Sequence, residues 1–203
     1  MIKASNITHY YGDELALDNI NLEINQGEFI CLVGESGSGK STLLSILSSL
    51  LKPSHGQLEI CEVNSKKIAD IDQFRRKNIG FVFQFHYLIE YLTVLENIEL
   101  ATDKHNSEKI KTLLHYLEIQ NIQHKYPNEI SGGQRQRSAI ARALANQPKI
   151  IFADEPTGNL DSKNSQKVFE LLKELSSQNI TIVVATDDAK LAQMADKIYE
   201  VQD

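Results

Sequence analysis

The chain has 203 residues, of which 41% are apolar and 24% charged, and its formal net charge is −6. These values allow one compact folded domain and disfavour both disorder and a general nucleic-acid binder, which would need excess lysine and arginine. No apolar run approaches the roughly 20 residues that a membrane-spanning helix needs. Residues 1–4 lack the basic start of a secretory signal, so we expect a cytoplasmic location.

Residues 2–30 predict a β-rich portion, because short extended runs are broken by turn residues at Gly12, Asp13 and residues 25–27. Phe29–Val33 then form a continuous apolar strand pattern. A loop of glycine and serine follows, and a helical pattern covers residues 40–51 before Pro53. Strand, glycine loop and helix therefore follow one another in that order.

The loop reads Gly34-Glu35-Ser36-Gly37-Ser38-Gly39-Lys40-Ser41, followed by Thr42, and fits the phosphate-loop pattern G-x-x-x-x-G-K-[ST]. Glycines let the main chain wrap round phosphate oxygens, so that N–H groups and the helix N-terminus face the anion. Lys40 can bridge the terminal phosphates, and the Ser41 hydroxyl can ligate Mg²⁺. The alternative is a plain glycine-rich turn, which the flanking strand and helix disfavour. We expect residues 34–42 to bind ATP with Mg²⁺.

Farther along the chain, strand patterns at residues 57–60 and 79–83 precede a helical stretch over about residues 88–145. Strand patterns resume at residues 150–153 and 180–185, with a helical pattern between them. Such alternation implies a mainly parallel sheet. The sequence thus predicts a single α/β domain over residues 1–203. Its core would comprise residues 1–86 and 147–203, and residues 87–146 would form an inserted helical subdomain.

Asp154 and Glu155 directly follow the strand pattern of residues 150–153. The carboxyl ends of parallel strands converge on the edge where ligands bind. We therefore expect Asp154 to hold Mg²⁺, and Glu155 to polarise the water that attacks the γ-phosphate. Alone, two acids after a strand are only a turn signal, but together with the phosphate loop they indicate a nucleotide site.

Ser131-Gly132-Gly133-Gln134 precedes a helical run and resembles the signature of ABC ATPases, with Ile130 where the family usually has leucine. Taken alone, the segment could be an ordinary glycine turn with a serine cap. A capped helix start with two glycines would form a second anion site. The resemblance covers nearly the whole chain. It implies a P-loop NTPase fold, with a RecA-like mainly parallel sheet, an N-terminal antiparallel β portion and an inserted α-helical subdomain.

The resemblance also implies roles for residues outside the two loops. Tyr11 matches the aromatic residue that stacks on adenine, and Gln84 matches the glutamine that senses Mg²⁺ and the attacking water. Asn159-Leu160-Asp161 matches the loop by which one subunit reports to the other. In the family, the signature of one subunit covers the ATP held by its partner. This implies a head-to-tail homodimer with two ATP molecules and integral membrane permease subunits as partners.

Residues 80–88, 92–97 and 153–161 look like the group that holds lipoprotein-releasing, macrolide-efflux and cell-division ABC ATPases. The stretch after Gln84 is most similar to the lipoprotein-releasing members, which implies a peripheral place on the cytoplasmic face of the inner membrane. Several apolar residues here would supply a docking surface for a membrane subunit, or else pack in the core. They are Phe85, Tyr87, Leu88, Ile89 and Tyr91.

One segment departs from the family pattern. The family usually has Thr-His-Asp after the last core strand, whereas this chain has Thr186-Asp187-Asp188. A carboxylate beside a bound phosphate is unfavourable in a partly desolvated site. Three explanations of this replacement are open. They are slow hydrolysis, a protonated Asp187 that acts as a hydrogen-bond donor, and a shifted loop that places Asp187 in solvent. The chain is then either a transport ATPase, with catalytic Glu155, Gln84 and Asp187, or a nucleotide-gated regulatory module with little turnover.

Overall fold

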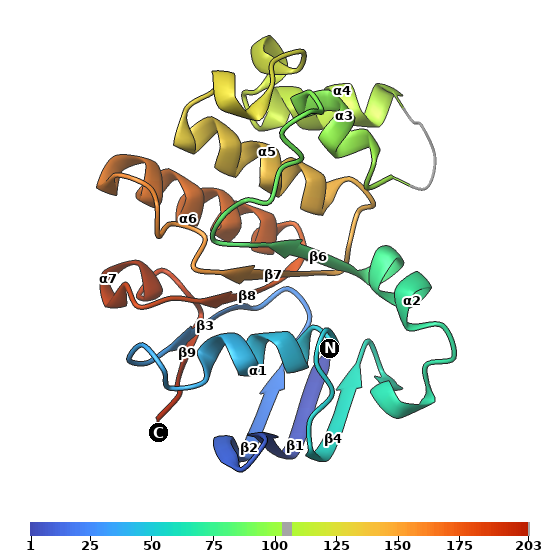
Figure 1. Cartoon of the computed structure of the whole chain (residues 1–203), viewed down its shortest axis with the longest axis vertical. Helices are drawn as coiled ribbons and strands as arrows, with labels where there is room; N and C mark the ends of the chain where they lie inside the picture. Colours follow the sequence, from blue (N-terminus) through green and yellow to red (C-terminus); the bar gives the residue numbers. More distant parts are fainter. Residues whose placement is uncertain (103–106, 203) are drawn as a thin grey trace.

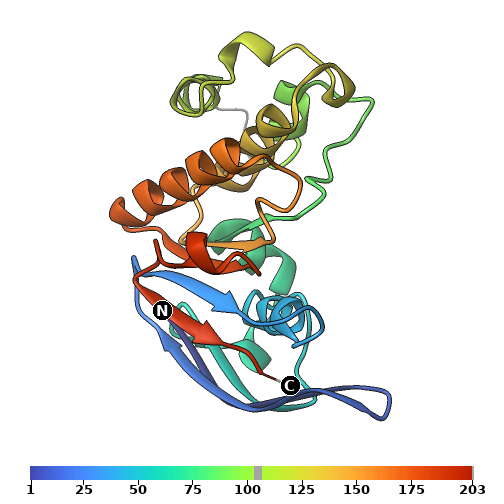
Figure 2. The ribbon, with the colours of Figure 1, turned by 90° about the vertical axis from the view of Figure 1, so that its left-hand side faces the viewer.

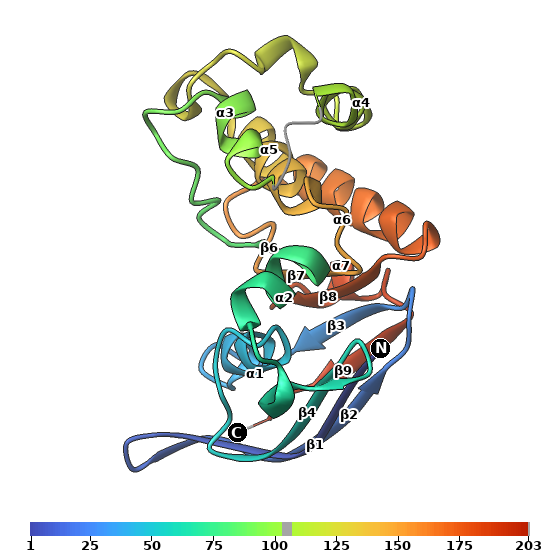
Figure 3. The same cartoon turned by 90° about the vertical axis from the view of Figure 1, so that its right-hand side faces the viewer.

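The computed structural model describes residues 1–102 and 107–202, which form two β-sheets and several helices (Figure 1). The first sheet is antiparallel. Its strand order is β2 (Glu14–Ile24), β1 (Ile2–Tyr11), β4 (His55–Ile60) and β5 (Val63–Asn64). Gly12, with φ 61°, begins the two-residue turn between β1 and β2, a conformation that glycine adopts without steric cost. The tip of this hairpin extends past the neighbouring elements in Figures 2 and 3.

The second sheet is parallel throughout. Its strand order is β6 (Ile79–Val82), β7 (Ile150–Asp154), β8 (Thr181–Ala185), β3 (Phe29–Val33) and β9 (Lys197–Glu200). Ala185 of β8 lies opposite Asp154 on one side and Leu32 on the other. The loops that follow β3, β7 and β8 therefore leave the sheet side by side.

Helix α1 (Lys40–Leu47) lies between the two sheets and contacts β2, β7 and β8 (Figure 1). It ends at Leu47, although the sequence pattern predicts helix as far as residue 51. The chain turns back on itself here, since Ser49 has φ 61° and the Leu51 N–H bonds to the Ser45 carbonyl. Left-handed residues of this kind commonly end helices.

The other helices are α2 (Ile71–Asn78), α3 (Val94–Glu99), α4 (Ser107–Tyr116), α5 (Gly132–Leu144), α6 (Ser162–Ser177) and α7 (Ala189–Ala192). Short 3₁₀ turns cover Ser65–Lys67, Gln120–Ile122 and Pro127–Glu129. α3, α4 and α5 are inserted between β6 and β7 in the chain and lie farthest from the antiparallel sheet (Figure 1). None of the helices in the described part is long and apolar enough to cross a bilayer.

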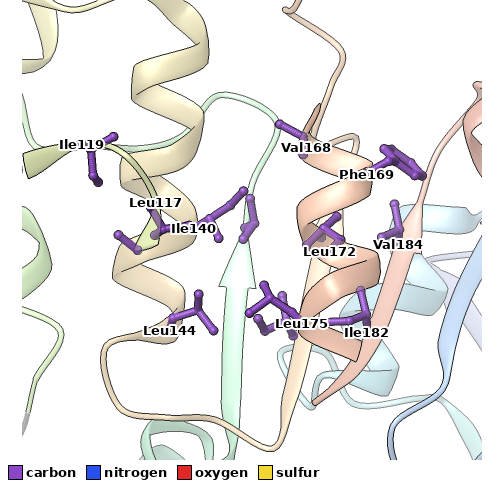
Figure 4. Packing of buried hydrophobic residues seen from close by; sticks show 14 of the residues in the cluster. Leu117, Ile119, Ile140, Leu144, Val168, Phe169, Leu172, Leu175, Ile182 and Val184 are labelled. Atoms are coloured by element: carbon purple, nitrogen blue, oxygen red, sulfur yellow. The ribbon is translucent and has the colours of Figure 1, made fainter. Parts of the chain in front are cut away.

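Alternate residues of the parallel strands face two separate cores, as expected for a sheet covered on both sides. On one side Ile30 and Leu32 pack with α1 and the antiparallel sheet. On the other side Phe29 and Cys31 pack with α5 and α6. Part of this second core is drawn in Figure 4, which labels Leu117, Ile119, Ile140, Leu144, Val168, Phe169, Leu172, Leu175, Ile182 and Val184. The fold is the P-loop α/β architecture that the sequence predicts.

Candidate active site

The phosphate loop (residues 34–41) leaves β3 and enters α1 at the carboxyl edge of the parallel sheet. Two of its glycines are required by close packing. A Cβ at Gly34 would lie 2.3 Å from the Val201 carbonyl oxygen, and one at Gly39 would lie 2.6 Å from the Ala16 oxygen. Gly39 also has φ 90° and caps the N-terminus of α1. The loop is therefore held between β9, β2 and α1 in a shape that only glycine permits at these positions.

Lys40 is buried inside this loop. Its ammonium donates to the carbonyl oxygens of Gly34 (2.8 Å) and Glu35 (2.7 Å). The first N–H groups of any helix, here those of Lys40, Ser41 and Thr42, have no partner within the helix. The Ser38 hydroxyl is buried and has no hydrogen-bond partner among residues 1–102 and 107–202. A buried cation, free N–H groups and an unpaired hydroxyl together fit a phosphate group.

Ser41 and Asp154 meet beside the loop. The Ser41 hydroxyl donates to Asp154 Oδ1 at 2.9 Å, although the two residues are far apart in the chain. Burial raises the pKa of Asp154, while the Ser41 hydrogen bond and the charge of Lys40 act in the opposite direction. A hydroxyl and a carboxylate at this distance are oxygen ligands of the type that Mg²⁺ prefers, so the pair fits the expected ion.

Glu155 turns out of β7 in a left-handed conformation, φ 43°, and its N–H bonds to the Ala185 carbonyl at 2.9 Å. The pKa of its carboxyl group is raised to about 7, first by burial and then by the neighbouring charges of Asp187 and Asp154, while the charge of Lys40 acts in the opposite direction. The Asp187 main chain also hydrogen-bonds to this carboxyl group. Glu155 is thus near the midpoint of its titration at neutral pH, where a proton acceptor works best.

Asp187 lies on the surface, next to the fully buried Thr186. Asp188 begins α7, and its carboxylate accepts hydrogen bonds from the N–H groups of Lys190 and Leu191. The loop therefore directs the Asp187 side chain to solvent while its main chain reaches Glu155. Of the three explanations for the missing histidine, this geometry favours the solvent-facing one, although the Asp187 charge still acts on Glu155.

Gln84 follows β6 by two residues and is half-buried. Asn159 donates its side-chain N–H to the Gln84 carbonyl at 3.2 Å, and a Cβ at Gly158 would lie 3.0 Å from Gln84 Nε2. The structure thus brings Gln84 against the loop that follows Glu155.

Ser131 caps α5 in a reciprocal pair: Gln134 N–H donates to the Ser131 hydroxyl (3.3 Å), and Ser131 N–H donates to Gln134 Oε1 (2.9 Å). Gly133 lies against α6, since a Cβ there would be 3.1 Å from Asn164 Oδ1. Ser131 itself is exposed. The expected helix cap is present, and Gly133 allows α5 and α6 to approach closely.

The phosphate loop and the signature (residues 131–134) belong to opposite faces of the parallel sheet. α1 packs with Leu32 and Phe152 on one face, whereas α5 packs with Ala153 and Val184 on the other. Figure 1 shows α1 and α5 on the two sides of the sheet. The structure therefore does not join the two anion sites within one subunit.

Tyr11 lies at the tip of the β1–β2 hairpin, and its side chain is 53% exposed. The same hairpin borders the phosphate loop through Leu17, whose Cδ2 would lie 2.9 Å from a Cβ at Gly39. The structure thus leaves the Tyr11 ring exposed on a hairpin that borders the phosphate loop.

Comparison with known proteins identifies the protein family. The profile of the ABC transporter family matches residues 17–158. The chain belongs to the ABC transporter family. The lipoprotein-releasing system ATP-binding protein LolD of Wigglesworthia glossinidia brevipalpis is 44% identical, with 100% of this chain and 94% of that protein covered.

Two further relatives extend the comparison. A macrolide export ATP-binding/permease protein, MacB, of Campylobacter jejuni is 41% identical over 100% of this chain but only 33% of its own length. A dimeric ATP-binding cassette of Methanocaldococcus jannaschii, solved in a post-hydrolysis state with ADP and Pi, has a TM-score of 0.89 and 42% identity, and 100% of this chain and 94% of that chain are covered. This ABC protein is thus an ATP-binding subunit with ATPase activity, as the sequence predicts.

Sequence reasoning missed one structural contact of this ABC ATPase. Arg142 of α5 donates to the carbonyl oxygens of His86 (2.6 Å) and Tyr87 (2.5 Å), just after Gln84. Both residues have positive φ, 63° and 45°, so their carbonyls turn toward the helix. No local sequence pattern links an arginine on a helix to a loop 55 residues away, so this contact could not be predicted from the sequence.

Proposed function

We propose that this ATPase works as a head-to-tail homodimer that closes on two ATP molecules with Mg²⁺. The supporting observation is the separation of the phosphate loop and the signature by the parallel sheet. The N-terminus of α5 points to solvent rather than to its own nucleotide, so a second copy is needed to complete each site. The related archaeal cassette was solved as a dimer with ADP and Pi, which supports a dimer for this chain.

Within each site, Lys40 and the N–H groups of the phosphate loop bind the phosphates, and Tyr11 stacks on adenine. Ser41, Asp154 and Gln84 would hold Mg²⁺, which neutralises phosphate charge. The deprotonated form of Glu155 accepts a proton from the attacking water, and its position is fixed by the hydrogen bond from its N–H to Ala185. Gln84 relays the state of the site to the membrane partner through its contacts with residues 158–159.

The proposed partner is an integral membrane permease, and the proposed process is lipoprotein release from the inner membrane, with the chain bound peripherally to the cytoplasmic face. The α/β core (residues 1–86 and 147–203) would bind ATP, and residues 87–146 would carry the signature and, together with Phe85, dock the partner. Phe85, Tyr87 and Tyr91 are exposed and offer an aromatic docking surface. Leu88 is instead buried, so it belongs to the core that supports this surface.

Two alternatives are open. A macrolide-type efflux ATPase is supported by the similarity to MacB. A nucleotide-gated regulatory module with little turnover is supported by Asp187, whose charge raises the pKa of Glu155 and so reduces the fraction of active base. Phosphate release measured with and without the permease separates a transport ATPase from such a module.

The dimer is tested with Glu155→Gln. This change leaves ATP binding intact and removes the proton acceptor, so we expect a stable dimer with Mg-ATP, seen by size-exclusion chromatography with light scattering. The control is the double variant Lys40→Ala/Glu155→Gln, which should stay monomeric because phosphate binding is weakened. A Glu155→Gln protein that stays monomeric at saturating ATP would refute the head-to-tail dimer.

A further inference from the structure

We propose that His9 is a positioning residue for nucleotide binding: it holds the ring of Tyr11 as a fixed platform for the adenine base. This inference rests on the proposed stacking role of Tyr11. It concerns a residue two positions earlier on the same strand, with its side chain on the buried face of the antiparallel sheet.

The His9 and Tyr11 rings form an edge-to-face pair. Their centroids are 4.8 Å apart and their planes meet at 86°. His9 is only 7% exposed, whereas Tyr11 is 53% exposed. One part of the tyrosine ring is therefore supported by a buried neighbour, and the rest is open to a ligand. Edge-to-face pairs at this distance restrict ring rotation and are favourable beyond their buried area.

His9 is itself anchored across the sheet. The Ser54 hydroxyl, just before β4, accepts the Tyr10 N–H at 3.1 Å and lies 3.4 Å from His9 Nδ1. A hydroxyl that accepts a main-chain N–H keeps its own proton to donate, so it can donate to an unprotonated Nδ1. Ser54 thereby binds the end of β1 both through the main chain and through the histidine ring.

The same residue connects the platform to the phosphate loop. His9 pairs with Leu17 across the hairpin, and the Leu17 side chain borders Gly39. Tyr11, His9, Leu17 and Gly39 thus form a continuous row of contacts from the proposed base site to the start of α1. Such a row fixes the spacing between base and phosphates before ATP arrives, which reduces the ordering cost of binding.

A purely structural role for His9 predicts a different outcome from a positioning role. If His9 only stabilised the sheet, its loss would weaken the binding of every ligand of the phosphate loop. If it positions Tyr11, the loss should depend on the presence of a base. Inorganic tripolyphosphate with Mg²⁺ provides the comparison, because it offers phosphates to residues 34–41 and nothing to Tyr11.

The experiment measures the affinity for ATP and for tripolyphosphate by calorimetry in the full chain and its variants. We expect His9→Ala to weaken ATP binding roughly twofold to tenfold, the range for one aromatic pair, and to leave tripolyphosphate binding unchanged. His9→Phe, which keeps an aromatic ring beside Tyr11, should restore ATP binding. In the double variant His9→Ala/Tyr11→Ala, the affinity should equal that of Tyr11→Ala alone.

The variants also distinguish the failure of each proposal. If Tyr11→Ala does not change the affinity for ATP, the stacking role of Tyr11 is wrong, and this inference falls with it. If Tyr11→Ala weakens ATP binding but His9→Ala does not, or if His9→Ala weakens both ligands equally, only the positioning role is overturned. Should His9→Ala not fold, Ser54→Ala removes the anchor instead, and it must weaken ATP binding without affecting tripolyphosphate.

Discussion

At the residue scale, the proposed role of Glu155 as proton acceptor makes hydrolysis depend on pH. The pKa of Glu155 is raised to about 7, by burial first and by the Asp187 charge second. Only the deprotonated form accepts a proton, so we expect the rate of phosphate release to rise as pH increases through about 7. Asp187→Asn removes a nearby negative charge, and the midpoint of the profile should move to lower pH.

Asp187→His tests the missing histidine separately from the charge. It removes the same anion as Asp187→Asn and adds an imidazole, which donates to the γ-phosphate if this solvent-facing loop turns inward when ATP binds. We expect a higher rate of phosphate release than in either the unmodified chain or Asp187→Asn. A fast ATPase before any substitution, or an identical rate in all three proteins, would show that Asp187 does not limit hydrolysis.

The raised pKa of Glu155 also affects stability. The pKa is higher in the folded chain than the ordinary value of 4.5, so folding favours the protonated form. The stabilisation is fully present below about pH 4.5 and is lost as pH rises through about 7. Glu155→Gln should therefore raise the melting temperature at pH 8 and have little effect at pH 4, as measured by thermal unfolding without nucleotide. The same shift at both pH values would contradict this explanation.

At the element scale, Arg142 joins α5 to the loop that follows β6. Its guanidinium is half-buried and donates to two carbonyl oxygens of residues in a left-handed conformation. Lysine cannot reproduce this bidentate geometry. We expect Arg142→Lys to increase proteolysis of residues 84–91 and to reduce stimulation of the ATPase by the permease.

Arg135→Lys is the matched control for that change. Arg135 also lies on α5, but its guanidinium donates to the Ile130 carbonyl rather than to the loop. Its substitution should leave the proteolysis of residues 84–91 unchanged. Equal cleavage of both variants would mean that the loop is not held by Arg142.

Local chemistry explains which elements the sequence predicts well. Phe29–Val33 and the loop after it are recognisable because an apolar run and a glycine pattern lie together in the chain. The end of α1 cannot be recognised in the same way, because it depends on the left-handed conformation of Ser49. The burial of Leu88 also could not be predicted, since it depends on Asn97, which hydrogen-bonds the main chain of Ile89 and fixes the loop.

The candidate site shows the same division. The phosphate loop, Asp154 and Glu155 follow from motifs, and the sheet register brings them together. Three other features arise only from tertiary packing. They are the contact of the His9 ring with Tyr11, the contact of Gly133 with Asn164, and the exposure of the Asp187 side chain to solvent. Residues that act through another side chain have no spacing pattern of their own, so a single sequence does not indicate them.

At the scale of the whole molecule, the two cores meet at the parallel sheet, and Phe169 is a test of the second one. It is fully buried, and Figure 4 shows its ring on α6. Its ring centroid lies 6.0 Å from that of Phe29. Phe169→Ala should lower the free energy of unfolding by about 3–5 kcal/mol, measured with urea. Tyr91→Ala, at a site that is 80% exposed, should change it by less than about 0.5 kcal/mol. Similar losses in both variants would contradict the packing described.

The place of α1 between the two sheets has a consequence for slow fluctuations. Leu43, Leu44, Ile46 and Leu47 are buried, and the helix contacts β2 on one side and β7 and β8 on the other. If α1 separated from either sheet, apolar side chains of the helix and of that sheet would be exposed to water. Its hydrogen-bonded amide hydrogens should therefore exchange with deuterated water only when the entire chain opens.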